Sequence, residues 1–243
     1  MNYVISDIHG CKQEFDAMLK KINYTQEDTL YILGDIIDRG KDGIALLKEL
    51  MFMDNVIPIL GNHELYAYTL LEKLYLIEEE YRSDLMDPSF LKELEYWMMD
   101  GGDVTIESFK KLDKESKCMI IEYLKEFLLW DIVETKNTTF LLVHAGLSNF
   151  SPERSLDSYT PEELVYERFD YEQPFFPEWT IISGHTPTML LQPERPAKIF
   201  KYKNHRVIDC GCVFGGRLAC LCLDTMEEYY VDSMQGKNFE EIL

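Results

Sequence analysis

Short apolar runs alternate with amphipathic stretches over the first sixty residues of the chain. Residues 3–5, 30–33 and 56–60 predict three strands, and residues 12–22 and 44–50 place apolar side chains at helical spacing. This alternation of strand and helix predicts parallel strands that are buried between layers of an α/β fold. Each predicted strand is followed by a turn that carries Gly, Asp or His, and such sheets bind ligands at the carboxyl ends of their strands.

The pattern becomes helical from about residue 65 to residue 130, and strands return afterwards. Residues 131–135 and 139–143 predict a hairpin, residues 180–183 a further strand, and residues 217–223 and 229–231 antiparallel strands. Between them, Thr160 and Pro161 have the N-cap and first-turn signals of a short helix that carries Arg168. We therefore predict one domain over residues 1–243, with a helical cap inserted at about residues 65–130.

The charge of the chain restricts its partners. It has 24 Lys and Arg against 44 Asp and Glu, which gives a net charge of −20. A surface this acidic repels nucleic-acid backbones and anionic membranes, so neither is an expected partner. No apolar run approaches the ~20 residues that span a bilayer, and the first residues lack a signal-peptide pattern, which predicts a cytoplasmic protein. The sequence does not indicate an oligomeric state.

Six cysteines are expected to be reduced thiols in that compartment. Cys210, Cys212, Cys220 and Cys222 form two C-x-C pairs, a poor match to a zinc site, whose cysteines are usually separated by two to four residues. A one-residue gap on a strand places both side chains on one face of the sheet. We interpret these cysteines as small buried apolar groups.

Histidines are the first indication of chemistry. The chain has five, and His9, His63, His144 and His185 each follow a predicted strand. The fifth, His205, lies in a polar segment and is expected to be exposed. Taken singly, the segment around each of the four fits a turn or a helix cap. Turns favour the neighbouring Gly, Asp and Asn, however, and have no need for histidine. Together, His, Asp and Asn at strand ends are the donors that divalent metal ions require.

Five ordered segments resemble the motifs of calcineurin-like metallophosphoesterases, and more narrowly those of phosphoprotein (serine/threonine) phosphatases of bacterial and phage-lambda type. They are residues 7–10, 34–40, 61–64, 144–146 and 183–186. The resemblance implies a two-sheet β-sandwich flanked by helices, with metal ions at the strand ends. Trp97, Gly101, Gly102 and Thr105 are also similar to the W-x₃-G-G-x₂-T segment of bacterial members, although an aromatic core residue and a helix end explain them equally well.

Carried over by position, the resemblance implies two divalent metal ions, manganese foremost, with iron or zinc also suited to the donors. Asp35 would be the bridging carboxylate. A water between the ions would lose a proton and attack phosphorus in line. The first ion would be held by Asp7, His9 and Asp35, and the second by Asp35, Asn62, His144 and His185.

The same resemblance assigns roles around the phosphate group. Arg39 and Arg168 would bind its oxygens together with Asn62, since a guanidinium can hold two oxygens at once. Arg168 fits a helix-surface arginine equally well. His63 would protonate the leaving oxygen, and Asp38 would hold the imidazole in its acidic form. Asp38 and Arg39 could otherwise be a turn residue and a surface charge.

The expected activity is hydrolysis of phosphomonoesters, above all phosphoserine and phosphothreonine in proteins. The alternative is symmetrical hydrolysis of diadenosine tetraphosphate, for which the helical insertion could build a nucleotide pocket. Glu64 and Asp38 favour the protein phosphatases. The dinucleotide hydrolases tend to have Asp where this chain has Glu64, and they tend to lack the aspartate that is Asp38 here. An inactive scaffold would have lost ligands, and none is missing. A related nuclease conflicts with the net charge of −20.

Overall fold

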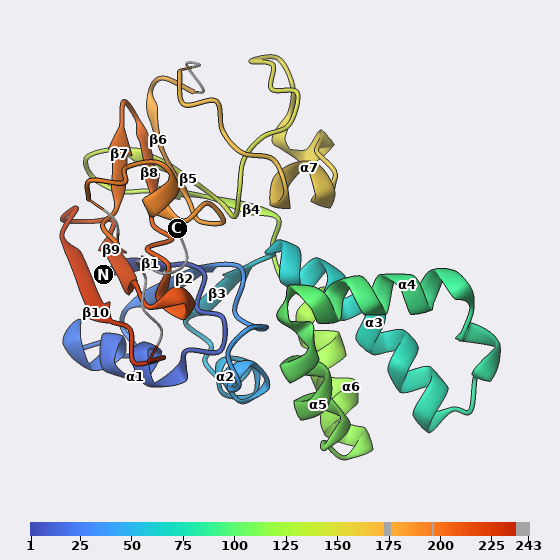
Figure 1. The fold of residues 1–243 in the computed structure, drawn as a ribbon. Coiled ribbons are helices and arrows are strands. Elements are labelled where there is room, and N and C mark those ends of the chain that lie inside the picture. The colour runs from blue at the N-terminus through green and yellow to red at the C-terminus, as the bar shows by residue number, and fades with distance from the viewer. Residues whose placement is uncertain (173–175, 196, 237–243) are drawn as a thin grey trace.

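Two five-stranded sheets form the body of the protein in the computed structural model, which describes residues 1–172, 176–195 and 197–236 (Figure 1). The first sheet contains β1 (Asn2–Ile5), β2 (Thr29–Leu33), β3 (Val56–Ile59), β9 (Arg217–Cys222) and β10 (Glu228–Asp232), in the order β10-β9-β1-β2-β3. The second contains β4 (Trp130–Glu134), β5 (Thr139–Val143), β6 (Trp179–Ser183), β7 (Phe200–Tyr202) and β8 (His205–Val207), in the order β4-β5-β6-β8-β7. The predicted two-sheet α/β sandwich is confirmed.

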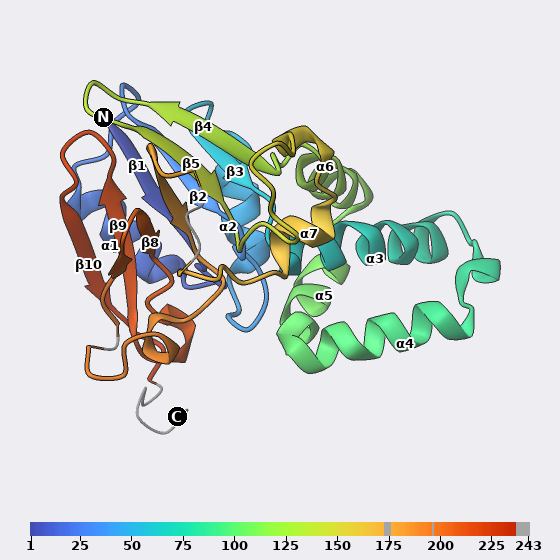
Figure 2. The ribbon, with the colours of Figure 1, turned by 90° about the horizontal axis from the view of Figure 1, so that it is seen from above.

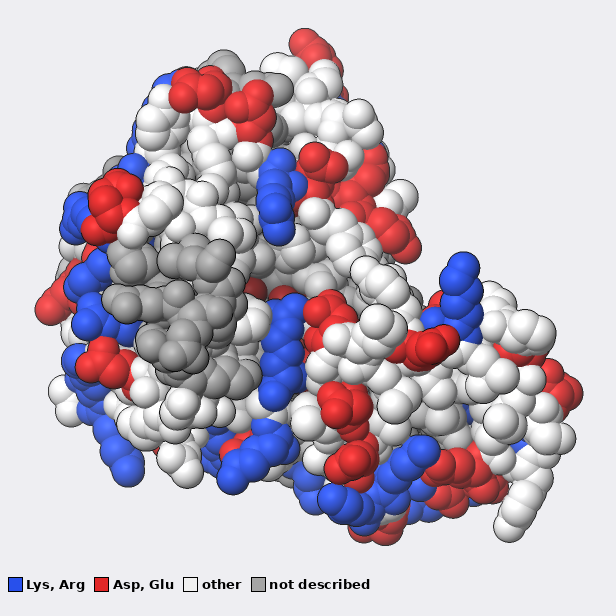
Figure 3. Space-filling view, in the orientation of Figure 1, with Lys and Arg blue, Asp and Glu red and all other residues white. Residues whose placement is uncertain are grey.

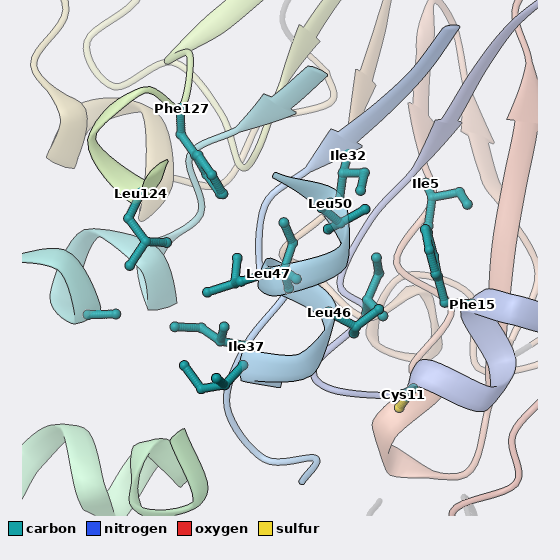
Figure 4. Packing of buried hydrophobic residues seen from close by; sticks show 14 of the residues in the cluster. Ile5, Cys11, Phe15, Ile32, Ile37, Leu46, Leu47, Leu50, Leu124 and Phe127 are labelled. Carbon is teal, nitrogen blue, oxygen red and sulfur yellow. The ribbon is translucent and has the colours of Figure 1, made fainter. Parts of the chain in front are cut away.

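The first sheet has the predicted parallel centre. β1 pairs with β2 and β2 with β3 in parallel, joined by helices α1 (Lys12–Lys21) and α2 (Gly43–Leu50). Both helices bury apolar side chains beneath this sheet, where Phe15 and Leu50 share a cluster with Ile5 and Ile32 (Figure 4). Burying each such side chain contributes about 1.5–3 kcal/mol, so this layer holds the strand ends in fixed positions.

A second apolar layer lies between the sheets. Val4, Tyr31 and Leu33 of the first sheet share it with Phe140 and Ile182 of the second. In the second sheet, β5, β6 and β8 run parallel, while β4 and β7 pair antiparallel at its edges. Both sheets therefore direct the carboxyl ends of their parallel strands to one edge of the sandwich.

The helical insertion projects sideways from the sandwich (Figures 1 and 2). It contains α3 (Asn62–Glu79), α4 (Pro88–Trp97), α5 (Asp103–Lys110) and α6 (Lys114–Lys125), with α6 packed on α3. The first helix begins at Asn62, three residues before the predicted start of the insertion, because Gly61 is extended and acts as its N-cap. The candidate residues Asn62 and His63 thus belong to the first turn of the insertion.

A π-helical turn, Met98–Gly102, joins α4 to α5. Gly101 adopts φ 95°, and a Cβ atom there would lie 2.7 Å from the Cγ atom of Arg39. Only glycine permits both this backbone conformation and this close approach. The turn therefore rests directly on the loop that follows β2.

The predicted helix at Pro161 is shorter than expected. Helix α7 covers Pro161–Val165, and Arg168 lies in the exposed loop beyond it. Continuation of the helix would require the carbonyl of Leu164 to accept a hydrogen bond from Arg168. That carbonyl instead accepts hydrogen bonds from Ala145 and Gly146 in the loop after β5. Tertiary contacts thus end the helix, and the expectation that it carries Arg168 is wrong.

His205 is also placed differently from the prediction. It lies in β8, is only 1% exposed, and packs its ring against Phe169 and Tyr171. The parallel pairing of β8 with β6 buries alternate residues, which the polar flanking sequence conceals.

The cysteines behave as expected. All six are free thiols, and Cys210, Cys212, Cys220 and Cys222 are buried. No helix in the described parts of the chain is both long and apolar enough to cross a membrane.

Candidate active site

The loops after β1, β2, β3, β5 and β6 meet at the carboxyl edge of the sandwich. His185 N donates to the Asp7 carboxylate at 3.0 Å, and His144 Nδ1 pairs with Leu33 O at 2.6 Å, so both sheets contribute to one set of loops. The structure gathers here all the predicted metal-site residues and the predicted acid with its partners, namely Asp7, His9, Asp35, Asp38, Arg39, Asn62, His63, His144 and His185.

Asp35 lies at the centre of this arrangement. Its Oδ2 atom is 3.5 Å from His9 Nε2 and 3.9 Å from His63 Nε2. Its Oδ1 atom is 3.5 Å from His144 Nε2 on the other side, where His185 joins the same group. One carboxylate therefore presents one oxygen to each of two nitrogen clusters, as a ligand shared by two ions must.

The histidine rings are oriented by the backbone. His9 Nδ1 pairs with Ile37 O at 2.8 Å, and His144 Nδ1 pairs with Leu33 O at 2.6 Å. Each ring therefore directs Nε2 into the site, as expected for a metal-binding histidine whose other nitrogen is fixed by a carbonyl. Asn62 Oδ1 lies 3.0 Å from His144 Nε2 and, from the other side, near His185. These nitrogen and oxygen donors fit two divalent cations that share Asp35.

Asp7 is buried at this edge of the sandwich, and its predicted role as a ligand of the first ion stays a prediction. His9 and Asp35 converge with His63, and Asp7 is not part of that three-residue group. Its carboxylate accepts hydrogen bonds from the Ser6 hydroxyl and from His185 N. Burial raises the pKa of Asp7, and the nearby charges of Asp209 and Asp35 raise it further.

Asp209 is a buried carboxylate of this site that the sequence interpretation did not select. It is 4% exposed, and burial raises its pKa to about 7. Its position beside Asp7 and Asp35 concentrates negative charge at the strand ends. Buried carboxylates in such proximity require cations to remain ionised, which supports a metal-binding role for this edge.

Unusual backbone conformations accompany the candidate residues. Left-handed φ angles cost a residue with a side chain of the order of 1–3 kcal/mol each and persist only where surrounding contacts enforce them. The values lie between 45° and 68° for Asp7, His9, Asp35, Asp38, Arg39 and His185.

Glu64 supplies much of this enforcement, and sequence reasoning used it only to compare families. Its carboxylate is fully buried and accepts hydrogen bonds from the backbone N–H groups of Asp35, Ile36 and Ile37, at 2.7, 2.8 and 3.2 Å. It also accepts one from the backbone N–H of Gly61, the N-cap of α3. Glu64 therefore fixes the loop of Asp35 to the helix that carries Asn62 and His63.

His63 has the environment of a protonated imidazole. Its Nδ1 atom is 2.7 Å from Asp38 Oδ2, with both side chains buried. Burial would lower the pKa of His63, but the charges of Asp35 and Asp38 raise it to about 9. Two groups of the insertion hold Asp38 in place, since Trp97 Nε1 donates to its Oδ2 and Thr105 Oγ1 to its Oδ1, both at 2.6 Å. Trp97 and Thr105 thus position Asp38.

Arg39 extends across the outer side of the site. Its Nη1 atom is 2.7 Å from His9 Nε2, so a metal ion at His9 would have to displace the guanidinium from that nitrogen. Its Nη2 atom donates to Asp100 Oδ1 at 3.0 Å, and Asp100 Oδ2 lies 3.6 Å from His63 Nε2. Arg39 N also donates to Gly101 O. The insertion therefore contacts both the backbone and the side chain of Arg39.

Arg168 is exposed in the loop after α7. Burial, together with the positive charges of His144 and Arg168, lowers the pKa of His185 to about 3. The predicted role of Arg168 in binding phosphate stays a prediction.

Comparison with known proteins identifies the family. The family model of calcineurin-like phosphoesterases matches residues 3–216. The chain belongs to this family. Its members are phosphoester hydrolases with a dinuclear metal site, and His9, Asp35, His144 and His185 are candidate ligands here. His63 lies in the same geometric group as His9 and Asp35, but its contact with Asp38 favours the protonated form, which cannot bind a metal ion.

Relatives of this phosphoesterase are dinucleoside tetraphosphatases by name. It is 25% identical to a symmetrical bis(5'-nucleosyl)-tetraphosphatase of Escherichia coli O1:K1 / APEC, with 98% of this chain and 97% of the relative aligned. It is 34% identical to one of Wigglesworthia glossinidia brevipalpis, over 49% of this chain and 43% of the relative. It is 26% identical to an asymmetrical bis(5'-nucleosyl)-tetraphosphatase, PrpE of Oceanobacillus iheyensis, over 96% of this chain and 92% of the relative.

Solved structures share the fold. One of a candidate diadenosine tetraphosphatase superposes with a TM-score of 0.63 at 20% identity, covering 97% of this phosphoesterase and 94% of that chain. A serine/threonine phosphatase of Saccharomyces cerevisiae superposes with a TM-score of 0.56 at 15% identity, covering 96% and 79%. At these identities the likeness establishes the architecture and leaves the substrate to be argued from the site.

Proposed function

We propose that this phosphoesterase hydrolyses dinucleoside polyphosphates, with symmetrical cleavage of diadenosine tetraphosphate as the reaction to test first. The observation that carries the proposal is the Asp35 carboxylate, which lies between two groups of imidazoles at the strand ends. The choice of substrate is supported by the names of relatives that align along nearly the whole chain.

The sequence features that favoured phosphoproteins lose their weight when their contacts are considered. Glu64 is fully buried and bonds to backbone N–H groups of two loops. Asp38 is fully buried and bonds to His63, Trp97 and Thr105. Neither side chain is exposed to a substrate, so neither can discriminate a phosphoprotein from a dinucleotide.

The residues of the site have defined tasks in this reaction. Arg39 and Arg168 would bind phosphate oxygens. Water adds to one phosphorus while the bond from that phosphorus to the bridging oxygen breaks. His63 Nε2, which lacks a hydrogen-bond partner among the described residues, would give its proton to the departing oxygen. Asp38 would hold His63 in the protonated form.

Two divalent cations, with manganese the first candidate, would supply Lewis-acid polarisation of the phosphate oxygens and activate the attacking water when bound. The residues that would hold them are Asp7, His9, Asp35, Asn62, His144 and His185.

Product analysis tests the proposal. With manganese present, diadenosine tetraphosphate should yield two ADP, whereas ATP and AMP would indicate asymmetrical cleavage. A phosphoserine peptide should be hydrolysed at a much lower kcat/KM, and the reverse preference would favour a protein phosphatase. Asp35→Asn should abolish turnover, and Asp16→Asn, which changes a half-exposed ion pair with Lys12 outside the group of candidate ligands, should not.

A further inference from the structure

Three tyrosine side chains gather beside the candidate site, each from a different segment. Tyr66 lies in α3, Tyr96 near the end of α4, and Tyr166 directly after α7. The ring of Tyr66 has its centroid 5.9 Å from that of Tyr96 and 6.2 Å from that of Tyr166. These distances are typical of aromatic rings in contact.

The cluster is close to the catalytic groups. Tyr66 is three residues after His63 and four after Asn62 on one helix, so its side chain lies one turn away on the same face. Helix α7, which leads to Tyr166, contacts α3 and lies between the sandwich and the insertion in the view of Figure 2. Besides burial and a hydrogen bond with Tyr66, the charge of Asp35 raises the pKa of Tyr166. The aromatic surface therefore borders the strand ends.

Two adjoining hollows open at this cluster, and each has a volume of about 290 Å³. Both are lined by Tyr66 and Glu93. Tyr68 and Tyr166 also line the first, and Tyr96 lines the second. This volume is at the lower end of the range for ligand pockets, and it suits a planar ring rather than a whole dinucleotide. Glu93 and Glu162 place carboxylates at the rim, where they could accept hydrogen bonds from a base amino group.

The tyrosines are more accessible than a structural role requires. Tyr96 is 59% exposed and Tyr166 is 40% exposed. On the face shown in Figure 3, the described Lys and Arg side chains are interspersed with Asp and Glu, so this face has no continuous positive patch that would retain an anionic nucleotide by charge alone. Stacking on aromatic rings binds a nucleobase without requiring positive charge.

We propose that Tyr66, Tyr96 and Tyr166 form a stacking platform for a nucleobase of the substrate. The inference rests on the proposed function, because it supplies the base-binding part of the same site. Phosphate groups bound at the strand ends would leave one nucleoside directed along α3 toward Tyr66. The neighbouring carboxylates would favour bases with an exocyclic amino group, such as adenine, over uracil.

Tyr96→Ala is the decisive variant, because an exposed side chain can be removed without disturbing the core. Loss of one stacked base should raise KM for diadenosine tetraphosphate about 5- to 100-fold, with kcat little changed. Hydrolysis of inorganic tripolyphosphate, which has no base, should change less than about twofold. Tyr96→Phe should retain most of the affinity, and Tyr81→Ala, which removes an 87% exposed tyrosine of the same insertion, should behave as the unsubstituted enzyme.

Calorimetric binding of ADP and of orthophosphate separates this inference from the proposed function. Tyr96→Ala should weaken ADP binding and leave orthophosphate binding unchanged. Equal effects on both ligands, or no effect on ADP, would overturn the stacking platform. If the enzyme hydrolyses tripolyphosphate but binds ADP no more tightly than orthophosphate, the platform is refuted while the phosphoester site stands. If no phosphoester is hydrolysed at all, the proposed function fails as well.

Discussion

Asp38→Asn should move the alkaline limb of the pH–rate profile toward lower pH, because Asp38 helps to keep His63 protonated. The pKa of His63 is about 9 in the folded protein. The difference between this pKa and the ordinary value of about 6.5 corresponds to about 3 kcal/mol of stabilisation of the protonated imidazole. Asp35 and Asp38 supply this stabilisation and also offset the cost of burying the charge. If Asp38 supplies about half, its neutralisation should lower this pKa by about one pH unit.

The same pKa has a consequence for stability. Because the folded-state pKa is raised, protonated His63 stabilises the fold fully below pH ~6.5, and this contribution is lost as the pH rises through about 9. In Asp38→Asn the loss should occur at lower pH. Urea denaturation between pH 6 and pH 10 would measure it alongside kcat/KM.

Asp100→Asn is the matched control, since it makes the same substitution near the same ring. Asp100 Oδ2 lies 3.6 Å from His63 Nε2, but its side chain is 45% exposed, so solvent screens its charge. It should move the limb much less than Asp38→Asn does. An alkaline limb that stays in place in Asp38→Asn, or an imidazole titration by NMR that is unchanged, would refute the role assigned to the pair.

Other predictions follow from the contacts of the site. Glu64→Gln should lower the free energy of unfolding by about 2–3 kcal/mol, because its amide cannot accept all of the backbone hydrogen bonds, whereas the exposed Glu107→Gln should have little effect in urea denaturation. Trp97→Phe should cost about 1.5–3 kcal/mol through the lost hydrogen bond to a buried carboxylate, and Trp130→Phe is its control. Chelation with EDTA should abolish turnover and manganese should restore it, with about two ions bound per chain by elemental analysis; turnover that survives chelation would contradict the metal assignment.

Sequence predicted the parts of the site that depend on local order along the chain. Strands 3–5, 30–33 and 56–60 each lead into a polar turn, and parallel pairing brings those turns to one edge whatever the details of packing. Histidine after such strands has few explanations other than chemistry, which is why His9 and His144 could be selected. The two-sheet architecture followed from the resemblance of the motifs.

Contacts between distant segments could not be predicted in the same way. Trp97 and Thr105 reach Asp38 across 59 and 67 residues, and their pattern fits a core residue and a helix end equally well. Glu64 resembles any helix-capping glutamate until the loop of Asp35 is folded against it. The position of Arg168 depends on hydrogen bonds that the loop after β5 makes to α7, which no local signal announces.

The docking of the π-helical turn on Arg39 means that the insertion is not a detachable accessory. Tyr96, for which we propose a role in stacking on the base, directly precedes Trp97, which holds Asp38, so one stretch of chain would govern both molecular recognition and proton delivery. Exchanging this module between relatives would transfer selectivity and acid chemistry as a unit. New preferences could then arise at the outward ends of its helices, while the inner end, anchored at Gly101, tolerates little variation.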